Sequence, residues 1–374
     1  MKMQQRTAVI ISVLLIALFT LMLAASGCGG GGDGDSIPAT IDSTTAPQSA
    51  SVLGDIAASA ELAITAITLN TGSGLYCPKT LLRHADRLWT RQGLALPGTL
   101  QSLGSDSSTD LCTDGGTVTI NATWDGPDNP QDCSEMKNLY LELVYANCQE
   151  GFETLNGTAG FYVPGDSCTD TPAAFDFSFS NLRYQNPSEG DDFTFNFTMV
   201  FSDLQYNTND YLVGGNVSFN GSMIGSLEGT SMDVTFDALK FAMAGTVYDV
   251  FDEIVEVTLT INGSMYGNID GDQFSERSRR LAVHYKQTVQ GAESGEEFTF
   301  NGDYTGGCLD GWITVETIIP IFLPDSGQCP TSGEVRIAGD GEATIEFYSD
   351  GSVTVYVGGD TLDYASCDDL PQCI

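Results

Sequence analysis

Residues able to perform acid–base, metal or nucleophilic chemistry are few in this sequence. Only two histidines occur, His84 and His284, which excludes an H-E-x-x-H zinc site and any centre with several histidine ligands. The G-x-S-x-G sequence around a hydrolase nucleophile is also absent. A catalytic group around one histidine is the enzymatic hypothesis that remains, and we expect instead a protein that is not an enzyme and uses no cofactor.

Basic residues form two groups. The first lies in a predicted helix over 79–92, where a spacing of four places its members along one stripe: Lys79, Arg83, Arg87 and Arg91. The second lies near His284 and comprises Arg277, Arg279, Arg280 and Lys286. Both groups are candidates for binding an anion or a lipid headgroup. Pairing with surrounding acids is the interpretation we favour, because exposed ion pairs are common and individually weak.

Aspartate next to glycine recurs at 33–35, 270–272 and 339–341. None of these segments has the ligand spacing of an EF-hand. Turn formation alone explains aspartate and glycine at such places. Divalent cations are therefore possible partners for so acidic a chain, but no motif supports them and no metal ligand is predicted.

Nine cysteines follow Cys28, and we expect disulfides among them if the chain is exported: Cys77, Cys112, Cys133, Cys148, Cys168, Cys308, Cys329, Cys367 and Cys373. Because nine is odd, at least one stays free or pairs elsewhere. Sequence does not determine the connectivity. We predict Cys308–Cys329 and Cys367–Cys373, since each closes a short loop. The absence of C-x-x-C excludes zinc ribbons, thioredoxin-like redox sites and covalent haem.

The first 27 residues have the pattern of an export signal. Lys2 and Arg6 precede an apolar run over 8–25, and small residues then lead to Cys28. The run of 18 residues is also just long enough for a membrane-spanning helix, so an uncleaved anchor is the alternative.

The segment Ala25-Ser26-Gly27-Cys28 resembles the lipobox of bacterial lipoproteins. That resemblance implies cleavage before Cys28, acylation of this cysteine with a fatty acid such as palmitate, and membrane attachment through the lipid. The family prefers Leu at the position of Ala25. Gly29 stands where Asp often retains lipoproteins at the inner membrane, so the resemblance favours the outer membrane, facing either the periplasm or the surface.

Composition divides the mature chain into three parts. Residues 28–50 are rich in Gly, Ser, Thr and Pro, which predicts a lipidated cysteine followed by a flexible tether. Residues 51–110 form a helical segment, with predicted helices over 51–70 and 79–92, that packs on the β unit. Residues 111–374 form a β-rich domain.

Charge excludes one class of partner. Without Lys2 and Arg6 the chain has 12 basic against 50 acidic residues, a net charge of −38. Nucleic acid binding rests on Lys and Arg that neutralise phosphates, so we exclude it. Solubility through self-repulsion is the simpler interpretation of so much negative charge.

From about residue 115 apolar and polar residues alternate, which is typical of strands with one buried face. Short connections, including an Asp-Gly turn at 350–351, favour a large antiparallel meander of about a dozen strands, as a barrel or a sandwich. Asn-Gly at 156, 220, 262 and 301 marks turns or bulges. A transmembrane barrel alternates too, but the lipid anchor and the cysteines argue against it. The pattern of Thr-, Asn- and Gly-rich hairpins, which is clearest at 329–360, resembles that of uncharacterised β-rich secreted bacterial lipoproteins.

The clearest alternation is a ladder of phenylalanines. Phe175, Phe177 and Phe179 alternate with polar residues in one predicted strand, and an apolar series alternates in the same way over 193–201. We expect these two strands to form a hairpin. Such a face is either ordinary core or the lining of an apolar cavity. Three hypotheses follow: a structural or interaction role in the envelope, with an envelope protein as partner; a carrier for an apolar or lipid-like ligand; and an uncharacterised enzyme.

Overall fold

The computed structural model describes residues 37–50, 53, 103–127, 135–166, 171–227, 229–250, 254–306, 309–325 and 329–371. The chain divides into two compact units. The described residues of unit 1 lie between 103 and 235, and those of unit 2 comprise 37–50, 53 and the residues from 236 onward. Among the described residues, no helix is long and apolar enough to cross a membrane.

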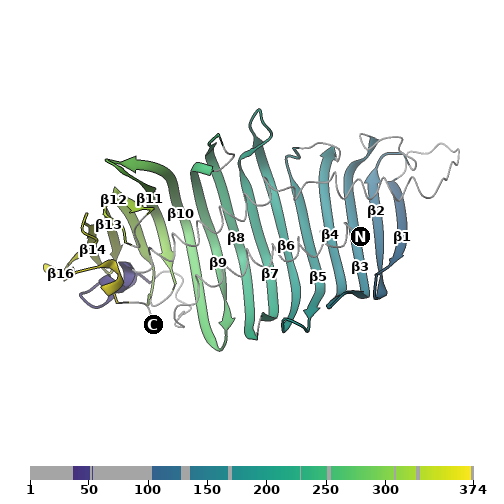
Figure 1. The fold of residues 1–374 in the computed structure, drawn as a ribbon, viewed down its shortest axis with the longest axis horizontal. Coiled ribbons are helices and arrows are strands. Elements are labelled where there is room, and N and C mark those ends of the chain that lie inside the picture. Colours follow the sequence, from purple (N-terminus) through teal and green to yellow (C-terminus); the bar gives the residue numbers. More distant parts are fainter. Residues whose placement is uncertain are drawn as a thin grey trace. The chain divides into compact units, whose positions relative to one another are not determined.

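Among the described residues, sixteen antiparallel strands form one sheet in which strands consecutive in the sequence are hydrogen-bonded neighbours (Figure 1). Unit 1 contains β1 Leu103–Leu111, β2 Gly115–Asp125, β3 Lys137–Glu150, β4 Glu153–Asp166, β5 Phe175–Asn186, β6 Asp191–Tyr206 and β7 Leu212–Leu227. The boundary falls within β8 Thr230–Tyr248. Unit 2 continues with β9 Ile254–Ile269, β10 Asp272–Gln290, β11 Glu293–Thr305, β12 Ile313–Pro324, β13 Ser332–Gly339, β14 Gly341–Phe347, β15 Val353–Val357 and β16 Asp360–Tyr364.

The predicted antiparallel meander is confirmed, but its predicted closure is wrong. In the part of the chain that the structure describes, a single sheet runs from β1 to β16 and these two strands do not pair, so there is neither a closed barrel nor the two separate sheets of a sandwich. The alternation that we used for the prediction reports which face of a strand is buried. It is identical in a barrel, a sandwich and an open sheet, so it could not distinguish them.

Alternation explains why the strands keep their register. In β6 the buried positions are every second residue from Phe193 to Phe201, and the intervening residues are partly or fully exposed. A slip by one residue would turn all five apolar side chains to the polar face. The same two-residue period marks β8 and β14, so one face of each strand is apolar.

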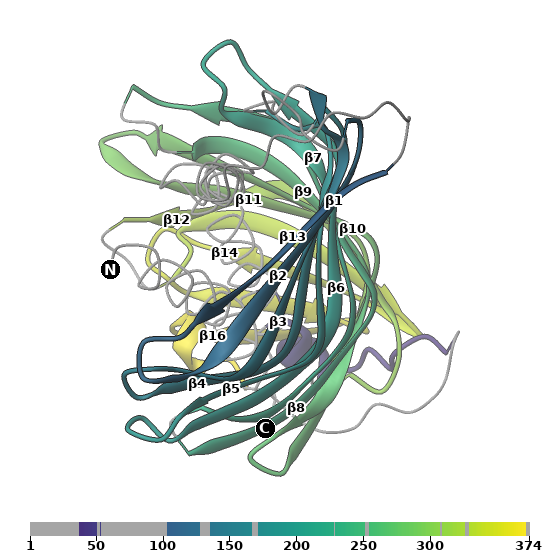
Figure 2. The same ribbon diagram turned by 90° about the vertical axis from the view of Figure 1, so that its right-hand side faces the viewer.

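Bulges interrupt the pairing in the middle of many strands. In unit 1 the register shifts between Tyr145 and Cys148 on β3, between Asn156 and Thr158 on β4, and between Ser178 and Leu182 on β5. An extra residue on one strand bends that strand and increases its twist. The strands β3 to β6 accordingly bow in the same direction (Figure 2).

The four Asn-Gly pairs lie inside strands and not in turns. They belong to β4, β7, β9 and β11, and Asn156 and Asn262 act at bulges. The side-chain oxygen of Asn156 accepts a hydrogen bond from the backbone N–H of Asn147 at 2.7 Å, and that of Asn262 accepts from Arg280 at 2.6 Å. Both donors have left-handed backbone, with φ of 49°. Of the two predicted roles, turn or bulge, the bulge is therefore the observed one.

The predicted domain boundaries need two corrections. β1 begins at Leu103, so the β-rich part starts before residue 111. Residues 37–50 are not a free tether, because they belong to unit 2 and contact its strand region, and residues 45–50 are helical. Pro38 bridges to Trp312 and Thr40 to Asp340, while Ala39 and Ala46 are buried. The small side chains of Ala39 and Ala46 permit this close packing. From composition alone, a segment rich in small residues had indicated a flexible tether. Apart from Leu53, the predicted helices over 51–70 and 79–92 lie outside the described residues.

Candidate functional site

The most distinctive feature of unit 1 is a set of eight phenylalanines and one methionine on one face of β4, β5 and β6. We call it the phenylalanine face, and it comprises Phe161, Phe175, Phe177, Phe179, Phe193, Phe195, Phe197, Met199 and Phe201. The predicted hairpin positions it: β5 pairs with β6, which places Phe175 opposite Phe201 and Phe177 opposite Met199. Both strands extend beyond the alternating apolar residues, since β5 continues to Asn186 and β6 begins at Asp191.

Ring contacts connect the phenylalanine face across three strands. Phe175 stacks on Phe201 with centroids 4.3 Å apart, and Phe177 lies 5.0 Å from Phe161 of β4. Phe179 continues the series toward Phe197 at 4.9 Å. Offset and edge-to-face contacts of this kind suit the charge distribution of aromatic rings and stabilise the face beyond simple area burial.

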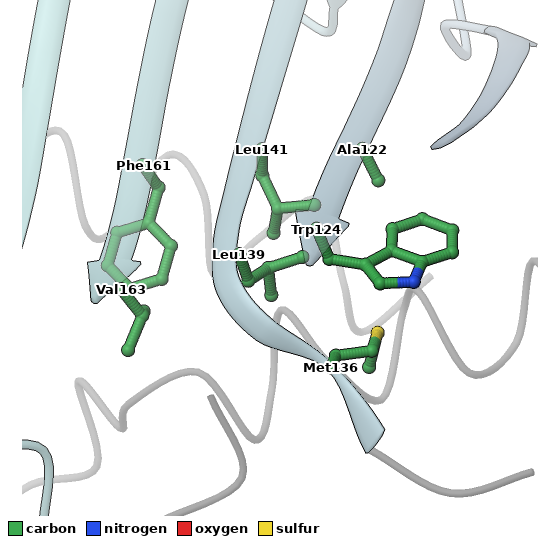
Figure 3. Close-up of a cluster of buried hydrophobic side chains, with 7 residues drawn as sticks. All are labelled: Ala122, Trp124, Met136, Leu139, Leu141, Phe161 and Val163. Carbon is green, nitrogen blue, oxygen red and sulfur yellow. The ribbon is translucent and has the colours of Figure 1, made fainter. Parts of the chain in front are cut away.

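Burial differs between the two strands of the hairpin. Phe193 is 1% exposed and Phe195 4%, whereas Phe175, Phe177 and Phe179 on β5 are only half-buried. Phe175 and Phe177 also pack against an adjoining cluster that contains Trp124, Leu139 and Val163 (Figure 3). The apolar face is thus continuous from β2 to β6.

The opposite face of the same strands is polar. Asn121 accepts a hydrogen bond from Ser107 at 2.7 Å and donates one to Glu142 at 2.9 Å, so three neighbouring strands are linked side chain to side chain. Arg183 holds Asp192 through two hydrogen bonds of 2.8 and 2.6 Å. The pKa of the Asp192 carboxyl lies below its ordinary value, mainly because of these hydrogen bonds from Arg183.

Polar groups meet the apolar face at one end of β4, β5 and β6. The Tyr184 hydroxyl donates to Glu153 at 3.3 Å, and Asn186 and Asp191 are buried nearby on the β5–β6 hairpin. Burial, together with the charge of Glu153, raises the pKa of Tyr184. On β3, burial raises the pKa of Tyr145 to about 12. The phenylalanine face itself has no titratable group, so its chemistry is restricted to apolar contact.

The second basic group does not form a single anion site. Its four members lie on β10, where a bulge at Arg280 separates Arg277 and Arg279 from the rest. The Arg279 guanidinium lies 4.0 Å from the centroid of the Trp312 ring. Lys286 is six residues beyond Arg280, about 20 Å along an extended strand, and pairs with Glu256 at 3.7 Å. Pairing with local partners is therefore the interpretation that fits Lys286. Lys79, Arg83, Arg87 and Arg91 lie outside the described residues.

His284 lies on the polar face of β10, 3.3 Å from the Glu256 carboxylate. Glu256 also pairs with Lys286 at 3.7 Å, so the three side chains form a polar network on a partly exposed surface. Such networks are common on sheets without any catalytic role. His84 lies outside the described residues.

Two disulfides occur among the described residues, Cys112–Cys148 and Cys329–Cys367. Their Cα atoms are 5.4 and 5.6 Å apart. The predicted pairs Cys308–Cys329 and Cys367–Cys373 are therefore wrong, because Cys329 and Cys367 bond to each other. Sheet pairing brings residues 38 positions apart together, and this outweighs closeness in sequence. Cys77, Cys133, Cys168, Cys308, Cys373 and the lipidation candidate Cys28 lie outside the described residues.

Possible metal ligands lead to no site. Among the described residues, Cys329, Cys367 and Asp368 are close enough to hold an ion, but both thiols are consumed by the disulfide. Asp270 and Gly271 form the β9–β10 turn, with φ of 53° and 97°. Asp340 joins β13 to β14 and donates its backbone N–H to Ala39 at 2.7 Å. Turn formation accounts for both aspartates.

No protein-family model, curated protein or solved structure matches this chain.

Proposed function

We propose that this chain is an exported, lipid-anchored protein of the cell envelope, favouring the outer membrane, whose sheet has a structural or binding role and no catalytic one. The observation that carries the proposal is the pair of disulfides, Cys112–Cys148 and Cys329–Cys367. Structural disulfides persist outside the reducing cytosol. The leader, the lipobox-like segment before Cys28 and the strongly acidic composition support the same location.

Intact-mass analysis of the chain purified from native membranes tests this proposal. We expect a mature chain that begins at Cys28, carries acyl groups, and gains mass on reduction in steps of two hydrogens. Cys28→Ser is the matched control, because it removes the acylated thiol and leaves the rest of the leader unchanged. A wild-type mass that includes residues 1–27 would contradict the lipoprotein proposal and favour the uncleaved anchor.

A second candidate function is the binding of an apolar or lipid-like ligand, and the phenylalanine face carries it. The half-buried rings of β5 are the part of this face with residual exposure. Any occupant would be held by apolar contact, which is typical of ligand sites lined by aromatic side chains.

Titration with a fluorescent fatty acid tests ligand binding. Phe177→Ala should weaken saturable binding by about tenfold, the effect of losing roughly 1.4 kcal/mol of contact. Phe300→Ala in β11 is the matched control, since it removes an equally apolar ring from unit 2. Urea unfolding of both variants separates lost contact from lost fold. Wild-type protein that shows no saturable binding rules out this second function.

A further inference from the structure

Two turns at one end of unit 1 expose large apolar side chains. Leu111 at the end of β1 is 84% exposed, and Phe152 between β3 and β4 is 75% exposed. Ile224, three residues before the end of β7 and opposite Thr194 of β6, is the remaining exposed large apolar side chain among the described residues of unit 1. In an antiparallel meander the β1–β2, β3–β4 and β5–β6 turns share one end (Figure 1). The β5–β6 turn, with Ser188 and Glu189, is polar, so among these three turns the large exposed apolar side chains lie on two adjacent ones.

Three links join these two turns into one body, which we call the apolar tip: Leu111 and Phe152 with the turn residues 112–114 and 151. Cys112, next to Leu111, is bonded to Cys148 of β3. The backbone N–H of Asp114 donates to the Gln149 carbonyl at 3.0 Å. The N–H of Gly151, next to Phe152, donates to the Asp114 carboxylate at 2.7 Å. The two side chains are therefore held in place before any partner is met, which lowers the entropic cost of binding.

Three backbone N–H donors of the apolar tip are already occupied. Besides Asp114 and Gly151, the N–H of Cys112 donates to the Gly116 carbonyl at 3.2 Å. An unsatisfied backbone group costs several kcal/mol in hydrocarbon. The tip can thus leave water without losing partners for these three groups.

We infer that the apolar tip inserts Leu111 and Phe152 into the interfacial region of a lipid bilayer with zwitterionic headgroups. A stable protein interface needs about 800 Å² from each partner, far more than two exposed side chains supply. A bilayer interface accepts apolar side chains without a complementary shape. Asp110, beside the tip, and Asp114, within it, are exposed, so anionic headgroups are repelled. This inference rests on the proposed membrane attachment and adds a second contact that fixes one end of unit 1 at the surface.

Tryptophan quenching in the full, natively processed chain tests the insertion. Phe152→Trp places a reporter at the tip, and Ile224→Trp, on a strand of the same unit, is the matched control. Each variant is mixed with phosphatidylcholine vesicles that contain or lack bromine on the acyl chains, and flotation records attachment separately. The emission of wild-type protein, which has three tryptophans, is subtracted.

If the tip inserts, bromine should quench the added emission of the Phe152→Trp variant at least twofold more than that of the Ile224→Trp variant. Quenching of the Phe152→Trp variant should become weaker when phosphatidylglycerol is added to the vesicles. Flotation without this difference overturns the inference and leaves the lipid anchor standing. Quenching without acylation at Cys28 overturns the anchor and leaves the inference standing. A blue-shifted emission from the reporter at position 152 that bromine does not quench overturns insertion in favour of a protein contact. Stronger quenching with phosphatidylglycerol overturns the zwitterionic preference.

Discussion

At the scale of single residues, Gly157 shows how a bulge constrains its neighbour strand. Its φ of 108° is rare for residues with a side chain, and a β-carbon there would lie 2.1 Å from the carbonyl oxygen of Asn181 on β5. Asn181 itself has left-handed backbone, with φ of 47°. The glycine of this Asn-Gly pair is therefore required by the close approach of the bulged strand.

We predict that Gly157→Ala lowers the free energy of unfolding by about 2–4 kcal/mol, because backbone strain and a clash occur together. Gly165→Ala is the matched control on the same strand, with φ of 74° and no atom within 4 Å of the added carbon. It should cost about 1 kcal/mol, from backbone strain alone. Urea unfolding followed by circular dichroism measures both losses, and equal losses would show that the clash is relieved.

Tyr145 gives the fold a sensitivity to alkaline pH. Burial raises the pKa of its hydroxyl to about 12, above the ordinary value of 10.0. The neutral form is thus favoured by folding, and its contribution is complete below pH 10 and declines as the pH rises from 10 toward 12. Tyr145→Phe cannot ionise, so it should lose less stability than wild type across that interval.

The measurement is the urea midpoint of wild type and Tyr145→Phe at neutral pH and at several values between pH 10 and 12. Other tyrosines with raised pKa values, Tyr140 and Tyr364 among them, are common to both proteins and cancel in the comparison. Parallel decline of the two midpoints would contradict the assignment of this sensitivity to Tyr145.

At the scale of elements, each disulfide joins a strand end to a partner that is distant in sequence. Cys367 begins the 3₁₀ helix η2 Cys367–Asp369, which follows β16, and Cys329 precedes β13. The bond therefore encloses the last four strands. Cys112–Cys148 encloses a loop of similar length within unit 1, with separations of 36 and 38 residues.

We predict that Cys329→Ser with Cys367→Ser costs about 3–4 kcal/mol, from the chain entropy that the loop restores to the unfolded state. Cys112→Ser with Cys148→Ser should cost a similar amount, since the loops are nearly equal. Hydrogen exchange distinguishes the two double variants. Loss of Cys329–Cys367 should speed exchange in β16 and η2, whereas loss of Cys112–Cys148 should speed exchange in the turns that carry Leu111 and Phe152. Faster exchange in the same segments for both pairs would contradict this.

At the scale of the whole molecule, negative charge is the dominant electrostatic feature. The full chain has a net charge of −36, and self-repulsion of this kind favours expanded states. We predict that the melting temperature rises as NaCl increases to about 0.15 M, where the screening length falls to about 8 Å.

Differential scanning calorimetry at increasing NaCl measures this rise. MgCl₂ or CaCl₂ at equal ionic strength is the control, because a larger rise with a divalent cation indicates binding at carboxylates in place of general screening. A melting temperature that stays constant or falls with NaCl would show that repulsion does not limit stability.

The sequence by itself determined the strand character of most of the chain, the antiparallel order and the phenylalanine hairpin, because alternation and turn residues act over a few neighbours. It missed β1, β4 and β16, whose alternation is weak: β1 reads LGSDSSTDL and β4 contains four small residues, Gly157, Ala159, Gly160 and Gly165. The apolar tip was also missed, although a large apolar residue within a turn, as in Gly151-Phe152, is a signal that sequence reading can use.

Only the tertiary structure decided that the sheet stays open, which cysteines pair, and that residues 37–50 contact the strand region of unit 2. Each depends on contacts between residues far apart in the chain. Cys329 meets Cys367 because β13 to β16 fold back on one another, and Gly157 opposes Asn181 because β4 and β5 shift register there. Local patterns specify which face of a strand is buried, and only the assembled strands specify what that face meets.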